Sequence, residues 1–203
     1  MGRTAMSHEI EKQSVKLCNK TIRGGPCNVH LVRCAPVELT SLRLIGPAGD
    51  GATDEHGKNI LCDQCASVWI ERCRCEGAQC AGDGINLYRC ADVTIRWCVI
   101  RGLRRNDDVD IAAGIVVDEG SHNVLISSCQ IEVPEPLAAI VIVGCNVDVI
   151  GCHGTGPIQI GLDGTRCYVG IVEISRWTGP QPYVAPDTIG QVWLNGKRIY
   201  CQR

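Results

Sequence analysis

The sequence contains no phenylalanine, and aromatic residues of all kinds make up only 4% of its 203 positions. It also lacks any apolar run near the roughly 20 residues that span a bilayer, so we expect no membrane insertion. Residues 1–20 are polar and charged, without the apolar stretch of a secretory signal. The formal net charge of −2 gives no electrostatic reason to expect nucleic acid or an anionic membrane as a partner.

The residues that are abundant favour a folded chain with an unusual interior. Apolar residues account for 45% and charged residues for 21%, a balance typical of one domain with a continuous core. Glycine occurs 23 times and cysteine 15 times. An odd number of cysteines leaves at least one thiol unpaired within the chain, or paired between chains.

An internal repeat explains much of this composition. The same pattern, a small-residue turn followed by alternating β-branched residues, occurs in five segments: 32–39, 63–70, 88–95, a weaker 119–126 and a shortened 143–149. The offsets from Cys34 through Cys65, Cys90 and Ser121 to Cys145 are 31, 25, 31 and 24 residues. A second series has nearly the same spacing. Its members are Leu42, Cys73, Cys98, Cys129 and Cys152, at offsets of 31, 25, 31 and 23 residues.

Each repeat unit reads as a short strand, a tight turn, a second strand and a glycine-containing loop. One such unit cannot bury its apolar face, but stacking equivalent faces at about 4.8 Å can. The sequence therefore predicts an all-β fold, a single-stranded right-handed parallel β-helix. The longer units carry extra residues in loops from Gly46 to Lys58 and from Gly102 to Gly114.

Both ends of such a solenoid need caps, because they expose strand edges. Ser7, followed by Glu9, Ile10 and Glu11, predicts a short amphipathic helix over the first coil. Asn195-Gly196, flanked by apolar residues, predicts a hairpin at the other end. We therefore expect a capped β-helix over residues 1–178, followed by a linker and hairpin cap over 179–203.

The cysteines favour interior ladders, since a cysteine is a small, easily buried residue that can fill equivalent slots in successive coils. A zinc site is an alternative, because the spacing of Cys62 and Cys65, with Cys73, Cys75 and Cys80 downstream, resembles metal ligation. Disulfides between coils are a third interpretation of the cysteines. Free thiols would indicate folding in a reducing compartment.

Three segments resemble motifs of the pectate lyases, within the pectin-lyase-like superfamily. Residues 19–24 (NKTIRG) resemble their opening SNKTIxG, residues 68–73 (VWIERC) their vWIDHc motif, and residues 83–86 (DGIN) with 93–95 (VTI) their DGxxD…VTIS pattern. The match covers roughly residues 15–130. Glu71-Arg72 stands in place of the family's Asp-His, and Asn86 in place of a further Asp.

This resemblance implies calcium-assisted β-elimination on an acidic polysaccharide. Carried over by position, the calcium ligands are Asp50, Asp54 and Asp83, and Arg104 binds substrate beside Arg105, the candidate catalytic arginine. The family's own catalytic arginine belongs to an RxPxxR segment, but residues 135–140 (EPLAAI) contain no arginine.

A second resemblance is to the polygalacturonases, which use aspartates on successive coils and a GHG motif. Asp83, Asp107-Asp108 and Cys152-His153-Gly154 occur in that order. This implies hydrolysis by paired carboxylates, with Asp83, Asp108 and His153 as catalytic residues. The 45 residues between Asp108 and His153 span about two coils where the family needs one.

The alternation places Trp69 outside the helix, because Val68 and Ile70 face inward. An exposed tryptophan can serve as a sugar-stacking platform or as an interface anchor. Two functions follow as hypotheses. One is a carbohydrate-engaging β-helix that binds or cleaves an acidic polysaccharide; the other is a non-catalytic structural or attachment component of a larger assembly, such as a virion. Either protein could form a homo- or hetero-oligomer.

Overall fold

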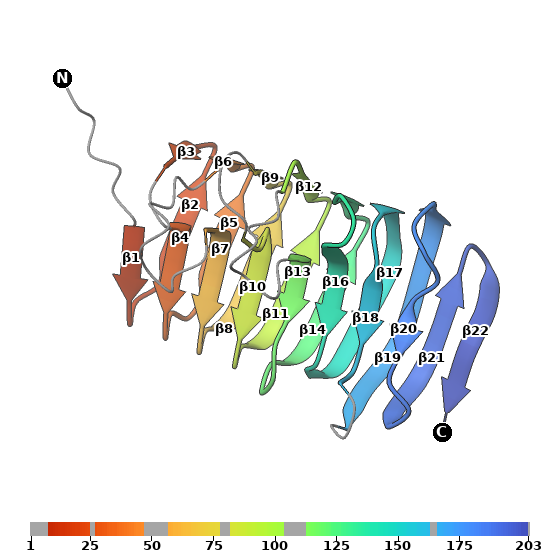
Figure 1. The fold of residues 1–203 in the computed structure, drawn as a ribbon. Helices are drawn as coiled ribbons and strands as arrows, with labels where there is room; N and C mark the ends of the chain where they lie inside the picture. The colour runs from red at the N-terminus through yellow and green to blue at the C-terminus, as the bar shows by residue number, and fades with distance from the viewer. Residues whose placement is uncertain are drawn as a thin grey trace.

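The computed structural model describes residues 8–24, 27–46, 57–77, 82–103, 113–162 and 166–202. This part of the chain is all strands and turns, and it contains no helix long and apolar enough to cross a membrane. The strands stack side by side along one axis with the termini at opposite ends (Figure 1). The predicted parallel β-helix is therefore confirmed.

The first face of the helix is an eight-stranded parallel sheet. Its strands are, in spatial order, β1 (His8–Glu11), β4 (Cys27–Val32), β7 (Lys58–Asp63), β10 (Ile85–Tyr88), β13 (Ala113–Val117), β16 (Ala138–Ile142), β18 (Ile158–Ile160) and β20 (Tyr183–Val184).

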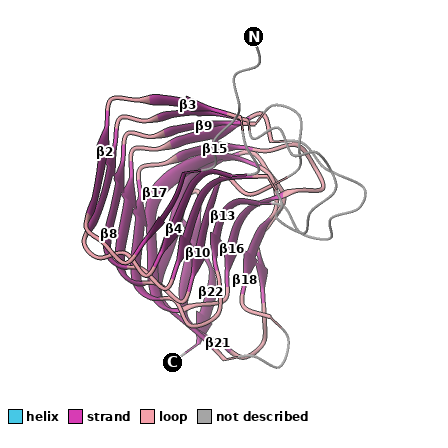
Figure 2. Ribbon diagram, turned by 90° about the vertical axis from the view of Figure 1, so that its left-hand side faces the viewer, coloured by secondary structure: helices cyan, strands magenta, loops and turns pink. Residues whose placement is uncertain are grey.

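The other two faces belong to one 14-stranded sheet, which bends around the core (Figure 2). The second face holds β2 (Val15–Cys18), β5 (Val37–Thr40), β8 (Ala66–Glu71), β11 (Ala91–Arg96) and β14 (His122–Ser127). The third holds β3 (Thr21–Arg23), β6 (Arg43–Ile45), β9 (Arg74–Glu76), β12 (Val99–Arg101) and β15 (Gln130–Glu132). The long strand β17 (Cys145–Thr155) pairs with both β14 and β15 and so joins the two faces.

The cysteine ladders are present as predicted. Cys34, Cys65 and Cys90 are at most 1% exposed, and the Cys34 backbone N–H contacts Cys65 Sγ at 3.4 Å. Buried thiols donate to carbonyls of the preceding coil, as Cys90 does to Cys62 at 3.2 Å. None of the 14 cysteines in the described ranges forms a disulfide, and burial raises the pKa of Cys75. The raised pKa favours the protonated thiol of Cys75, which fills space in the core.

The expected alignment of the shortened fifth repeat is wrong by one residue. Cys145 lies opposite His122 rather than Ser121, and its side chain is exposed. Gly144 occupies the interior position instead, and a Cβ there would lie 2.5 Å from the Ser121 carbonyl oxygen. The ladder resumes at Cys167, which is fully buried and donates to the Gly144 carbonyl at 3.4 Å. One residue of slip moves a side chain to the opposite face.

The predicted N-terminal helix is wrong. Residues 8–11 form strand β1, with Ile10 in register with Leu31 of β4. The alternation of His8, Glu9, Ile10 and Glu11 has the period of a strand, and pairing with β4 satisfies backbone groups that a helix would leave open. Strand pairing therefore outweighs the helix-start signal.

The C-terminal hairpin is present. Strands β21 (Thr188–Leu194) and β22 (Lys197–Gln202) pair antiparallel around Asn195 and Gly196, which have φ values of 50° and 79°. Strand β21 also pairs in parallel with β19 (Cys167–Trp177), and β20 pairs with β18. The last strands thus extend the stack, and the division of the chain at residue 178 stays a prediction.

Candidate carbohydrate-binding surface

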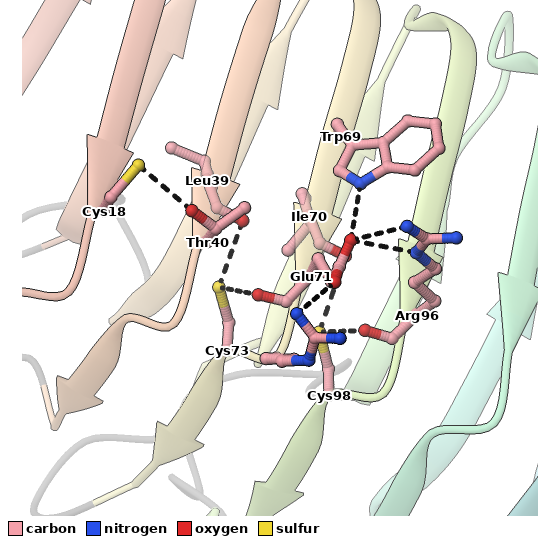
Figure 3. A network of polar contacts seen from close by, with 10 residues as sticks. Cys18, Leu39, Thr40, Trp69, Ile70, Glu71, Cys73, Arg96 and Cys98 are labelled. Atoms are coloured by element: carbon pink, nitrogen blue, oxygen red, sulfur yellow. Dashed lines mark hydrogen bonds and ion pairs between the residues drawn. The ribbon is translucent and has the colours of Figure 1, made fainter.

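The outer surface where β8 turns into β9 carries a cluster built around Glu71. Glu71 ends β8 and is 7% exposed, because neighbouring side chains cover it. Its Oε2 accepts hydrogen bonds from Trp69 Nε1 at 2.9 Å and from Arg96 Nε and Nη2 at 3.0 and 2.7 Å. Its Oε1 lies 2.7 Å from Arg72 Nη1. Figure 3 shows the carboxylate between the indole and the guanidinium groups.

Arginine and tryptophan side chains stack beside this carboxylate. The Arg96 guanidinium lies 4.5 Å from the ring centres of both Trp69 and Trp97, and that of Arg72 lies 4.9 Å from Trp97. Trp69 and Trp97 remain 39% and 45% exposed. Cation–π contact and ion pairing both favour one arrangement, so these flat groups are held in place before any ligand arrives.

A second carboxylate organises three arginines on the adjoining face. Glu76 Oε2 lies 2.9 Å from Arg43 Nη2, and Glu76 Oε1 lies 2.8 Å from Arg101 Nη2 and 3.7 Å from Arg74 Nε. The three arginine side chains are about half exposed, whereas Glu76 is mostly covered. Solvent therefore meets arginines rather than glutamates.

We call these residues together the basic-aromatic patch: Arg43, Trp69, Glu71, Arg72, Arg74, Glu76, Arg96, Trp97 and Arg101. Five arginines against two glutamates leave three positive charges here, on a chain whose formal net charge is −2. Guanidinium groups bind carboxylates in a planar, two-pronged manner, and exposed tryptophans offer apolar faces to sugar rings. The patch is suited to an anionic carbohydrate.

Among the predicted site residues, Trp69 is placed outward as expected. Asp83 is 5% exposed; its Oδ1 accepts the Ala113 backbone N–H at 2.9 Å and its Oδ2 accepts the Asn86 amide at 2.7 Å. The bond to Ala113 ties successive coils together, whereas the bond from Asn86 is made within one coil. His153 lies half-buried on β17, in register with Gln130.

The remaining predicted residues lie outside the described residues, namely Asp50, Asp54, Arg104, Arg105 and Asp108. In the described ranges no three His, Cys, Asp or Glu side chains gather in a way that could hold a metal ion. The Asp83 carboxylate is engaged on both oxygens, so the described residues do not by themselves fit calcium. A calcium site stays a prediction that depends on Asp50 and Asp54.

The sequence matches the family model described as the right handed beta helix region over residues 13–153. The chain belongs to the right-handed β-helix family. The resemblance to pectin-lyase-like β-helix proteins is thus confirmed for the fold. No curated protein is similar enough in sequence to count as a relative.

A solved structure supports the same fold for this β-helix protein. It is the tailspike protein gp49 from Pseudomonas phage LKA1, with a TM-score of 0.57 and 12% sequence identity. The alignment covers 92% of this chain and 43% of the tailspike chain. At this identity the likeness shows the fold alone, and the β-helix protein corresponds to less than half of that chain.

The hydrogen bond from Trp69, followed by those from Arg96, lowers the pKa of Glu71 below its ordinary value of 4.5. The stabilisation of this β-helix by Glu71 is therefore present above the ordinary carboxyl pKa and is lost as pH falls through the lowered one. In an NMR acid titration, the Trp69 indole N–H resonance should move with a midpoint below pH 4.5. Glu71→Gln should abolish that transition; a midpoint at or above 4.5 would contradict the geometry.

Proposed function

We propose that this protein is a carbohydrate-binding β-helix that attaches to an acidic polysaccharide through the basic-aromatic patch. The observation that carries the proposal is the stack of Trp69, Arg96 and Trp97 around Glu71. Sugar recognition uses flat apolar surfaces with a few fixed polar groups, and the arginines add selectivity for anions. A tailspike protein with the same fold supports an attachment role.

The chemistry of the patch supports binding rather than hydrolysis. Hydrolysis needs a carboxylic acid whose pKa is raised so that it can donate a proton. The pKa of Glu71 is lowered, chiefly by Trp69, and that of Glu76 is lowered chiefly by Arg101. Both carboxylates stay ionised at neutral pH and serve to orient the arginines.

The test replaces the two exposed tryptophans. Trp69→Ala combined with Trp97→Ala should weaken binding to polygalacturonate or hyaluronan about 100-fold, because one hot-spot tryptophan contributes about 2 kcal/mol or more and the losses of neighbouring ones do not add in full. Binding is measured by isothermal titration calorimetry, and the thermal midpoint is recorded alongside. Raising the salt concentration should also weaken binding by the intact protein, since exposed charges are screened.

The matched control is Tyr183→Ala. Tyr183 is an aromatic residue of comparable exposure, 48%, but it lies on β20 of the first face. Its removal should leave the affinity unchanged. Equal losses in both variants would place the binding elsewhere, and no binding of either polysaccharide by the intact protein would favour the purely structural role.

A further inference from the structure

A polar groove on the second face begins beside Trp69. It is a hollow of about 360 Å³ bordered by Asp92, Thr94, Asn123, Leu125, Asn146 and Asp148. Thr94 is in register with Trp69 on one side and Leu125 on the other, and Leu125 is in register with Asp148. These four residues form a column along the helix axis. From Trp69 to Asp148 it crosses three inter-strand steps of about 4.8 Å each, or about 14 Å.

One wall of the groove is a ladder of hydrogen-bonding side chains. Asn123 Nδ2 donates to Asp92 Oδ1 at 2.9 Å, and Asn146 Nδ2 donates to Asn123 Oδ1 at 2.7 Å. All three residues are exposed and have φ values from 54° to 56°, which aligns their side chains in successive coils. A carboxamide has two N–H donors and two acceptor lone pairs, so each rung keeps capacity for a ligand hydroxyl.

The charge of the groove is opposite to that of the patch. Two carboxylates, Asp92 and Asp148, border this described hollow, and no lysine or arginine does. Asp148 Oδ1 accepts the Ile171 backbone N–H at 2.8 Å, which fixes the carboxylate at the far end. A uronate placed here would meet two like charges, whereas a neutral sugar would meet acceptors and amides for its hydroxyls.

We infer that the polysaccharide lies along the helix axis, with an acidic sugar on the basic-aromatic patch and neutral sugars in the groove. One pyranose residue advances by a distance close to one coil, so successive sugars fall opposite successive rungs. The preferred ligand is then a heteropolysaccharide in which uronates are separated by neutral residues, rather than a homopolymer of uronates. This inference rests on the proposed function and adds its specificity.

The experiment varies charge without changing the sugar backbone. Polygalacturonate and hyaluronan are each compared with the same polymer after half of its carboxyl groups have been methyl-esterified. For polygalacturonate, half-esterification should tighten binding about tenfold, because neutral residues then reach the groove. For hyaluronan, in which only the Leu125 step of the groove would hold a uronate, the gain should be smaller. Full esterification should abolish binding of both, because the patch requires an anion.

Two variants locate the effect in the groove. Asp92→Asn with Asp148→Asn removes both charges but keeps the hydrogen-bond acceptors, and it should abolish the preference for half-esterified polygalacturonate. Asn123→Gly removes the central rung at a positive φ that glycine accepts. It should weaken hyaluronan binding about tenfold, whereas Ser128→Gly, at a φ of 52° in the same coil, should not.

The outcomes separate the two proposals. If the intact protein binds neither polymer in any form, the proposed function and this inference both fail. If polymers bind through Trp69 and Trp97 but esterification weakens binding steadily in the intact protein and the double variant alike, only the inference fails. Equal behaviour of Asn123→Gly and Ser128→Gly would also overturn it.

Discussion

Gly154→Ala should destabilise the fold by about 4 kcal/mol or more, one of the largest effects expected from a single methyl group. Gly154 lies on β17 with a φ of 146°, and a Cβ at this position would overlap the Ile131 carbonyl oxygen. That oxygen belongs to the backbone of the preceding coil and cannot rotate away as a side chain would. The coils would have to separate locally and lose their hydrogen bonds.

A control is available three residues earlier on the same strand. Gly151 has a φ of 65°, and the nearest atom to its Cβ position is Ser128 Oγ at 3.9 Å. Ser128, Trp97 and Arg72 adopt similar φ values at the equivalent corner of earlier coils. Gly151→Ser should therefore cost less than about 1 kcal/mol. Urea unfolding followed by circular dichroism measures both, and similar losses would show that conformation, not contact, matters at Gly154.

The same geometry bears on the Cys152-His153-Gly154 motif. The contact with Ile131 demands a glycine at position 154 whether or not His153 has a chemical role. Cys152 is a fully buried member of the second ladder. Packing of the core and of the backbone thus accounts for Cys152 and Gly154, and catalysis by His153 stays a prediction.

The sequence predicted the β-helix well because its repeat is visible in residues that must stack. Cys73, Cys98 and Cys129 recur at the length of one coil, and each is at most 1% exposed. Interior slots of successive coils share shape and depth, so they select the same residue types. At the last step the first series was read with an offset of 24 residues where the second series has 23, and there Cys145 was misplaced by one residue.

The prediction for the N-terminal segment failed for a different reason. Helix-start signals are local, whereas β1 owes its structure to pairing with β4, which lies about 20 residues further along the chain. A prediction from a local pattern cannot take account of the strand edge of β4, which exists only once the stack has folded. Strand alternation over four residues was too short to decide against a helix.

Only one member of the candidate site, Trp69, was found from the sequence, because alternation fixes its direction. The rest of the patch has a signal of another kind. Glu71 and Arg96 are 25 residues apart, as are Glu76 and Arg101, and this is the length of the coil between Cys73 and Cys98. Opposite charges one coil apart are neighbours on adjacent strands, so charge pairs at the repeat offset would have revealed the patch.

Asp83 shows that one short motif fits two different roles at a turn. An aspartate before glycine is expected both in a binding motif and in a turn. In the structure its carboxylate accepts the Ala113 N–H of the next coil, which a turn-forming residue can do without any ligand. The loops that held the other predicted ligands follow no repeat, so neither their direction nor their neighbours could be derived from spacing.

Ile95→Ala should lower the free energy of unfolding by about 3 kcal/mol, because deleting buried methyl groups leaves a cavity that the stack cannot close. Ile95 is fully buried on β11, in register with Ile70 before it and Ile126 after it. Each neighbour is fixed by its own strand pairing at about 4.8 Å, so neither can move in to fill the space.

The comparison is Ile150→Ala, which removes the same atoms from the outer face of the same sheet. Ile150 is 42% exposed, and its loss should change stability by less than about 0.5 kcal/mol. Both values come from chemical denaturation monitored by circular dichroism.

In a stack held by nearest-neighbour contacts, a cavity at Ile95 weakens two interfaces at once and should uncouple the coils on either side. Hydrogen exchange should then show the N-terminal and C-terminal coils opening separately in Ile95→Ala; a uniform loss of protection would mean that the solenoid unfolds as one unit.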